Sequence, residues 1–259
     1  MDDNIGHIID TEFKKILKLQ GLSFIKALLE FEEYRFDNSF LNGSVYEEMN
    51  SEFGIFPPKK VYPMYFMGDI TKPKNKIIFV GINPGYNKKL NNNEQEYLEK
   101  HGSFLGYCTH FTHRASISRR SAYFSHIGGF LHRVGMMSEK MTWDWLQNHF
   151  INMDLIPYHS TNASGLRINN LPHYKDRYFI PITKIVDYLQ PVKPIFIVGF
   201  PTFEKYFSDS IFAGLIDFKK HDGIWTGTIL KKYKFIGLPF LNRVAGGKDK
   251  LAASVKKYF

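Results

Sequence analysis

The chain has 259 residues, a formal net charge of +9 and a single cysteine, Cys108. One cysteine excludes an internal disulfide and a cysteine-ligated iron–sulfur cluster, and we expect it to be a small buried residue. No apolar run approaches the ~20 residues of a membrane span, and the polar start of the chain lacks the apolar region of a secretion signal. We therefore expect a cytoplasmic protein that is not a membrane protein. Its basic surface favours a polyanionic partner, with nucleic acid first and an anionic membrane surface second.

The first part of the chain predicts helices and then a buried strand. Apolar residues at helical spacing predict one or two helices over residues 10–36, with a break at Gly21. Prolines between this segment and residue 76 indicate a loop-rich connection. Residues 76–82, "KIIFVGI", are apolar on both faces and rich in β-branched side chains, which predicts a fully buried strand.

The rest of the chain alternates between helix and strand patterns. Helices are predicted at residues 122–137, 180–190, 201–208 and 246–259, strands at 149–159 and 194–200, and a hairpin leading into a last strand at 223–239. This alternation is typical of an α/β protein, which we expect to be a three-layer α/β/α fold with a mostly parallel central sheet. We expect residues 1–70 to form an N-terminal helical extension packed on a main domain of residues 71–259.

Several common catalytic motifs are absent from the sequence. It contains no G-x-x-x-x-G-K-[ST] phosphate loop, no G-x-G-x-x-G after a strand, no G-x-S-x-G elbow and no H-E-x-x-H. His110 and His113 could meet on one helix face, but two ligands do not make a metal site. We expect no metal and no other cofactor.

Candidate chemistry lies at the predicted strand ends, because open parallel sheets bind ligands beyond the carboxyl ends of their strands. Three such ends mix Gly or Pro with polar residues: "GINPGYN" from Gly81, "NMDLIPYHSTNASG" from Asn152 and "GLPFLNRVAGG" from Gly237. Asn83 stands between a buried strand and a tight turn. Its amide could orient a reacting water or could simply cap the turn.

A buried strand that ends in "GINPG" resembles motif A of the uracil-DNA glycosylase superfamily, in the form found in the mismatch-specific uracil/thymine glycosylases. The resemblance extends from Ile77 to Phe259. In it, "INMDLIPYHS" holds the place of the base-reading strand, "PIFIVGFPTFEKYF" that of the third strand and its helix, and "KFIGLPFLNRVAGG" that of the second motif. One departure stands out: "LPFLNR" has Pro239 but neither the preceding His or Asn nor the following Ser of that motif.

The resemblance implies a uracil-DNA glycosylase-like fold and a monofunctional DNA glycosylase that works as a monomer. Such an enzyme flips a pyrimidine and hydrolyses its N-glycosidic bond, leaving an abasic site. The base would be uracil, a mismatched base or a modified one, including a bulky hypermodified cytosine in foreign DNA, so DNA repair and antiviral defence are both open. The alternatives are an inactive glycosylase-like DNA-binding protein and an α/β enzyme that processes nucleosides or nucleotides.

The resemblance also assigns roles to individual residues. Asn83 would orient the water, Asp154 could be a second water activator or an ordinary partner of an arginine, and Asn152 could read the base through its amide. The expected substrate-binding residues are Gly81, Ile82, Pro84, Gly85, Tyr86, Phe104, Phe111, Asn152 and His159. The expected DNA-binding residues are Arg114, Arg119, Arg120, Leu241, Asn242, Arg243, Gly246 and Lys248, with Leu241 as a wedge that enters the base stack. Core packing is the alternative for the aromatic rings, and an ordinary basic surface is the alternative for the arginines.

Overall fold

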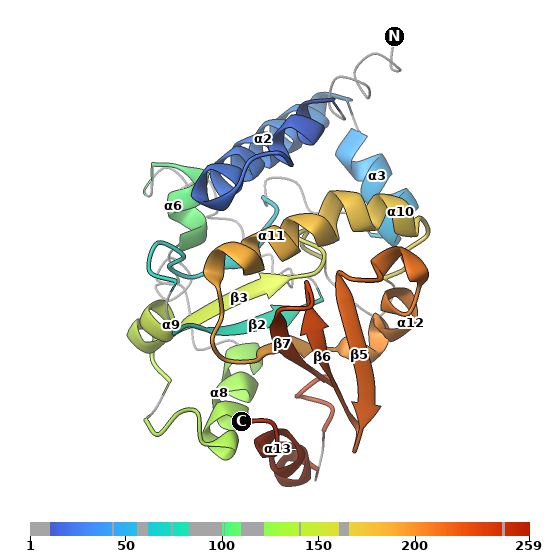
Figure 1. The fold of residues 1–259 in the computed structure, drawn as a ribbon. Helices are drawn as coiled ribbons and strands as arrows, with labels where there is room; N and C mark the ends of the chain where they lie inside the picture. The colour runs from blue at the N-terminus through green and yellow to red at the C-terminus, as the bar shows by residue number, and fades with distance from the viewer. Residues whose placement is uncertain are drawn as a thin grey trace.

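A seven-stranded sheet in the order β1-β3-β2-β4-β7-β6-β5 forms the centre of the protein in a computed structural model (Figure 1). The structure describes residues 11–42, 44–55, 62–73, 75–82, 100, 102–109, 122–139, 141–160, 166–244 and 247–259.

The middle of the sheet is parallel and its edges are antiparallel. The parallel strands are β3 (Phe150–Asp154), β2 (Ile77–Gly81), β4 (Ile195–Val198) and β7 (Tyr233–Leu238). The antiparallel edge strands are β1 (Phe66–Met67) beside β3, and β6 (Ile224–Ile229) and β5 (Ile216–His221) beyond β7. This arrangement confirms a mixed α/β fold. Because β1 belongs to the sheet, the sheet begins before the domain boundary expected at residue 70.

Helices cover both faces of the sheet. Figure 1 shows α8 (Ala122–Val134) and α13 (Lys248–Lys256) on one side, and α2 (Gly21–Asn42) and α11 (Ile180–Leu189) on the other. Every residue of β2, β3 and β4 is buried, which explains why these strands read as continuous apolar runs. On the first side, the Phe130 ring of α8 packs edge-on against Phe79 of β2 and Phe196 of β4, with ring centroids 6.2 and 5.5 Å away.

The remaining helices are short. Those that the structure describes include residues 11–16, α3 (Ser44–Phe53), α6 (Phe104–Thr109), α9 (Trp143–His149), α10 (Leu171–Tyr174) and α12 (Glu204–Phe207), with a π-helical turn η1 (Lys175–Phe179) and 3₁₀ turns η2 (Phe200–Thr202) and η3 (Ser210–Phe212). Gly21 begins α2 with a positive φ of 59°, so the predicted break at this glycine is confirmed. Cys108 is buried in α6, also as predicted.

A buried lysine aligns the first two parallel strands. Lys76 immediately precedes β2, and its Nζ donates to the carbonyl oxygens of Gln147 and Asn148 at 2.9 and 2.8 Å, in the last turn of α9. A cation is favourable at that end of a helix, where carbonyl groups lack intrahelical partners. Since α9 runs directly into β3, this contact holds the start of β2 beside the start of β3, where Ile77 pairs with Phe150.

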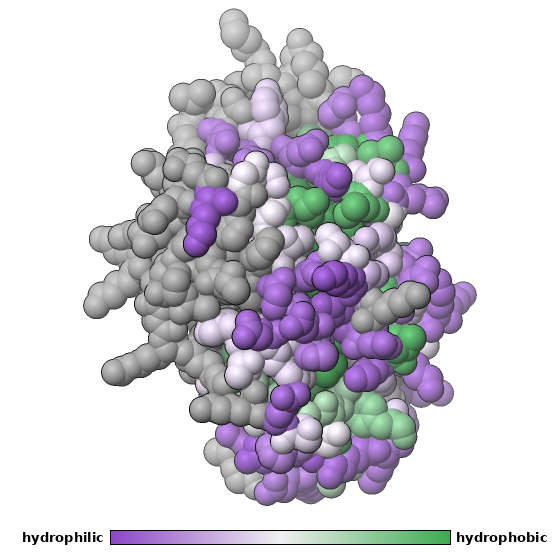
Figure 2. All heavy atoms as spheres, turned by 90° about the vertical axis from the view of Figure 1, so that its left-hand side faces the viewer, coloured by the Kyte–Doolittle hydropathy of each residue, from purple (hydrophilic) through white to green (hydrophobic). Residues whose placement is uncertain are grey.

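The surface on the side of α6, α8 and α9 is largely hydrophilic in its described residues, with smaller apolar areas (Figure 2). No helix in the described ranges combines the length and apolar character needed to cross a bilayer.

Candidate functional site

Two polar side chains lie at the carboxyl end of β3, beside the end of β2. The parallel register places Asn152 next to Phe79 and Asp154 next to Gly81. Asn152 and Asp154 are two residues apart on a strand, so both side chains point to the same face, the one covered by α8. They are only 6% and 5% exposed, which makes them unusual among the mainly apolar residues of the core.

A tyrosine from α8 completes this polar cluster. The Tyr123 hydroxyl donates to Asn152 Oδ1 at 2.9 Å, and Asn152 Nδ2 donates to Asp154 Oδ2 at 3.4 Å. Burial, and secondarily the Asp154 carboxylate, raise the pKa of Tyr123 well above its ordinary value, so its hydroxyl keeps its proton at neutral pH. The carboxylate and the phenol together fix the orientation of the Asn152 amide.

Gly81 makes room for the Asp154 carboxylate. A Cβ atom at Gly81 would lie 2.6 Å from Asp154 Oδ1 and 3.4 Å from the Tyr123 hydroxyl. Backbone pairing continues beyond the strands, because Leu155 N donates to Gly81 O at 3.0 Å and Ile156 N donates to Ile82 O at 2.8 Å. The carboxylate therefore lies directly against the backbone that leads into Asn83.

An apolar surface borders the cluster at the ends of the next two strands. Gly199 follows β4 with a positive φ of 79°, and a Cβ atom there would lie 2.8 Å from the Phe240 ring and 2.9 Å from Ile82 Cδ1. Ile82 and Phe240 therefore pack over the Gly199 backbone. Arg243 lies over the partly exposed Phe240 ring, with its guanidinium carbon 4.9 Å from the ring centroid.

The structure brings together four of the predicted site residues, Gly81, Ile82, Asn152 and Asp154, at adjacent strand ends. His159 lies five residues beyond Asp154 and is fully buried. The following predicted residues lie outside the described part of the chain: Asn83, Pro84, Gly85, Tyr86, Phe111, Arg114, Arg119, Arg120 and Gly246.

Two predicted roles do not fit the structure. Phe104 is 2% exposed, with its ring centroid 5.4 Å from that of Tyr62 and 6.0 Å from that of Tyr107, so it packs in the core and offers no free face to a base. Leu241 is 6% exposed, whereas a wedge must project from the surface, so in this conformation Leu241 is not one. Asn242 and Arg243 are exposed beside it.

Sequence reasoning missed two residues of this region, Tyr123 and Phe240. Tyr123 sits in the first turn of a predicted helix, but a helical pattern does not specify which strand residue the helix will meet. Phe240 directly follows Pro239 at a predicted strand end. That position was a usable signal, because ligands bind at such ends.

No group of three His, Cys, Asp or Glu side chains that could hold a metal ion occurs among the described residues. Comparisons of the chain with models of known protein families and with curated protein sequences gave no match.

Proposed function

We propose that the protein is a DNA glycosylase that flips a pyrimidine out of DNA and hydrolyses its N-glycosidic bond, leaving an abasic site. The observation that supports this most directly is the buried Asp154 carboxylate, held with the Asn152 amide against Gly81, two residues before Asn83. Buried polar groups at the carboxyl ends of parallel strands are typical of binding and catalytic sites.

The cluster has the groups that this reaction needs. Cleavage passes through a transition state in which the sugar resembles a cation, so the enzyme must place a water and stabilise the departing base. In the proposed mechanism the Asn83 amide orients that water, and Asp154 accepts its proton. The Asn152 amide has two donor hydrogens and two acceptor lone pairs, of which Asp154 and Tyr123 use one each. No other described residue uses the second donor and the second acceptor of this amide, and these are the groups that would read a flipped base.

The substrate class rests on charge and on the second motif. A net charge of +9 favours a polyanionic substrate over a free nucleoside. The segment "LPFLNR" lacks the His or Asn and the Ser of the superfamily motif, and this favours a modified pyrimidine over plain uracil. A bulky hypermodified cytosine in foreign DNA belongs to this class, and a mismatched pyrimidine is a separate candidate substrate.

The test is incubation with oligonucleotides that carry uracil, mismatched or modified pyrimidines, and with natural DNAs rich in modified bases, followed by quantification of abasic sites. We expect the wild-type protein to form abasic sites in at least one modified DNA, and we expect Asn83→Ala and Asp154→Asn to lose this activity. Asp144→Asn makes the same change as the latter at an exposed position on α9 and should keep wild-type activity.

Other outcomes would assign a different function. Binding of DNA without abasic sites on any substrate would favour a non-catalytic DNA-binding protein, which the altered second motif makes the next candidate. Hydrolysis of the N-glycosidic bond in free nucleosides, without formation of abasic sites in DNA, would favour a nucleoside-processing enzyme. An Asn83→Ala protein that cleaves as fast as wild type would refute the role of Asn83, even if the reaction itself is confirmed.

A further inference from the structure

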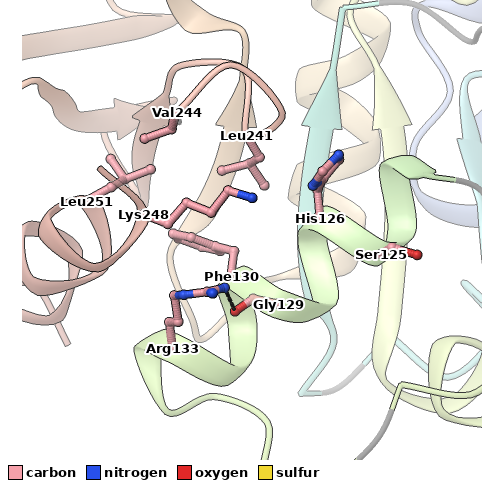
Figure 3. Close-up of a pocket in the computed structure, with 9 residues that line it drawn as sticks. All are labelled: Ser125, His126, Gly129, Phe130, Arg133, Leu241, Val244, Lys248 and Leu251. Atoms are coloured by element: carbon pink, nitrogen blue, oxygen red, sulfur yellow. Dashed lines mark hydrogen bonds between the residues drawn. The ribbon is translucent and has the colours of Figure 1, made fainter. Parts of the chain in front are cut away.

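An open pocket lies between α8 and the segment that runs from the end of β7 into α13 (Figure 3). Its rim carries basic side chains from both sides, and its floor is apolar. The rim contains His126, Arg133 and Lys248, and the floor contains Phe130, Leu241 and Leu251.

The rim has an excess of positive charge. Lys248 forms no ion pair with any residue that the structure describes, and Figure 3 shows it extended across the pocket above Phe130. Arg133 donates from Nε to Asp249 Oδ1 at 3.1 Å and from Nη1 to Gly129 O at 3.0 Å. Two permanent cations thus face one carboxylate, and that carboxylate is 94% exposed.

The combination of floor and rim fits one kind of ligand better than a simple anion. A phosphate alone gains nothing from an apolar floor, and an apolar ligand gains nothing from the positive charge of the rim. A nucleotide in a DNA strand has both features, because its sugar and base offer apolar surface while its phosphate is a strong acceptor for Lys and Arg.

Helix α8 connects this pocket to the candidate site. Tyr123, in its first turn, contacts Asn152 of the site, while residues from Ser125 to Arg133 of the same helix line the pocket. These residues follow Tyr123 by two to ten positions, which corresponds to ~3–15 Å along an α-helix at ~1.5 Å per residue. Successive phosphates of one DNA strand advance by ~3.4 Å along a duplex, so a strand that follows α8 would reach the pocket within about one to four steps of the site.

We propose that this pocket binds a nucleotide of the DNA strand within about four positions of the target base, with its phosphate at Lys248 and Arg133 and its sugar over Phe130. This inference rests on the proposed function, because it takes DNA as the ligand. It adds His126 and Arg133 to the predicted DNA-contacting residues and sets the direction in which the strand leaves the site.

The first test measures binding of an oligonucleotide by Lys248→Gln and Arg133→Gln as a function of salt. Each variant should bind several-fold more weakly than wild type, and the slope of log affinity against log salt should become shallower by about 1 for each lost phosphate contact. Lys256→Gln removes an equal charge from an exposed position on the same helix and should bind like wild type. Both side chains of interest lie at the surface, and thermal unfolding would verify that the variants are folded.

The second test varies the length of DNA on each side of the target. If the pocket takes a flanking nucleotide, the difference between wild type and Lys248→Gln should vanish as one flank is shortened through the last four or so nucleotides before the target, and only on that side. Three outcomes would overturn the pocket assignment and leave the proposed function intact. Lys248→Gln and Arg133→Gln could bind DNA with the affinity and salt dependence of wild type, or Lys256→Gln could lose as much DNA affinity as they do. The third outcome is a loss of affinity in Lys248→Gln that does not depend on flank length. Failure of the wild-type protein to bind any DNA at low salt would refute both.

Discussion

At the scale of single residues, the candidate site depends on glycine at position 81, because a residue with a Cβ atom would collide with Asp154. A Cβ atom there would approach Asp154 Oδ1 to 2.6 Å, so Gly81→Ala must displace the carboxylate or bend the end of β2. We expect the variant to remain folded, at a cost of about 1–3 kcal/mol in the free energy of unfolding. Its rate of abasic-site formation should fall by about 100-fold, because a displacement of ~1 Å at a reacting group has an effect of that size.

Gly128→Ala provides the matched control for this substitution. Gly128 lies in α8, and its added Cβ would meet the Met141 side chain at 3.4 Å, an ordinary contact with a flexible neighbour. This variant should keep wild-type activity and lose no stability, since Ala is preferred to Gly within a helix by about 1 kcal/mol. Equal rates in Gly81→Ala and wild type would show that the position of Asp154 does not matter for the reaction.

The same residues show what sequence could and could not reveal about the site. The strand predicted at residues 149–159 contains Asn152 and Asp154, and residues two apart on a strand share a face, as the hydrogen bond between these side chains shows. The Tyr123 contact was not predictable, because it depends on how α8 crosses the sheet. The burial of Leu241, which lines the same pocket as residues of α8, also depends on tertiary packing.

At the scale of elements, a buried cluster of charges joins the N-terminal helices to the rest of the protein. Glu32 of α2 is fully buried and accepts hydrogen bonds from Arg177 at 2.6 Å, Tyr158 at 2.7 Å and Arg35 at 3.4 Å. Arg35 also pairs with Glu48 of α3. The cluster thus links α2 and α3 to η1 and to the segment that follows β3, so these helices are part of the fold's core.

Glu32→Gln should destabilise the protein by about 3–5 kcal/mol. The substitution preserves shape but leaves two buried guanidinium groups with one carboxylate fewer, and removing one partner of a buried ion pair has a cost of this order. Denaturant unfolding followed by circular dichroism would measure it. Glu12→Gln breaks an exposed pair with Lys15 and should change stability by less than about 1 kcal/mol. Similar small effects in both variants would mean that the buried cluster contributes no more than a surface pair.

The elements that sequence predicted are those with a strong apolar pattern. β2 and β4 are buried on both faces, and α11 has an apolar stripe, so their existence was clear. β5 was missed because most of "IDFKKH" is at least partly exposed at the sheet edge. The helix that contains α11 also starts earlier than predicted, through α10 and η1, where Arg177 and Tyr178 point into the buried cluster.

At the scale of the whole molecule, two groups at the edge of the buried cluster around Glu32, namely His173 and Glu48, make the stability of the protein depend on pH. His173 of α10 lies 3.3 Å from Glu48 Oε1, and this hydrogen bond raises the pKa of His173 despite its partial burial. Burial alone would raise the pKa of Glu48, but Arg35 and the hydrogen bonds from His173 and Tyr178 outweigh it and hold that pKa well below its usual value. Stability therefore depends on Glu48 at acid pH and on His173 near neutral and alkaline pH.

The sign of each contribution follows from the direction of the shift. A raised histidine pKa means that the folded state holds the proton more tightly, so the stabilisation by His173 is complete below its unfolded pKa of about 6.5 and is lost as pH rises through the folded value. A lowered carboxyl pKa means the reverse, so the stabilisation by Glu48 is complete above about 4.3 and is lost at acid pH. Between these limits, both contributions are present.

His173→Gln separates the histidine contribution from all other titrating groups. The free energy of unfolding of wild type should exceed that of the variant at pH 5.5, and the difference should shrink as pH rises to 8.5, because neutral His173 no longer gains from the Glu48 carboxylate. Urea unfolding of both proteins at several pH values would measure this difference. A difference that stays constant over the range would show that the His173–Glu48 contact does not depend on charge. The pH dependence that both proteins retain would then come from the remaining histidines and carboxylates of the chain.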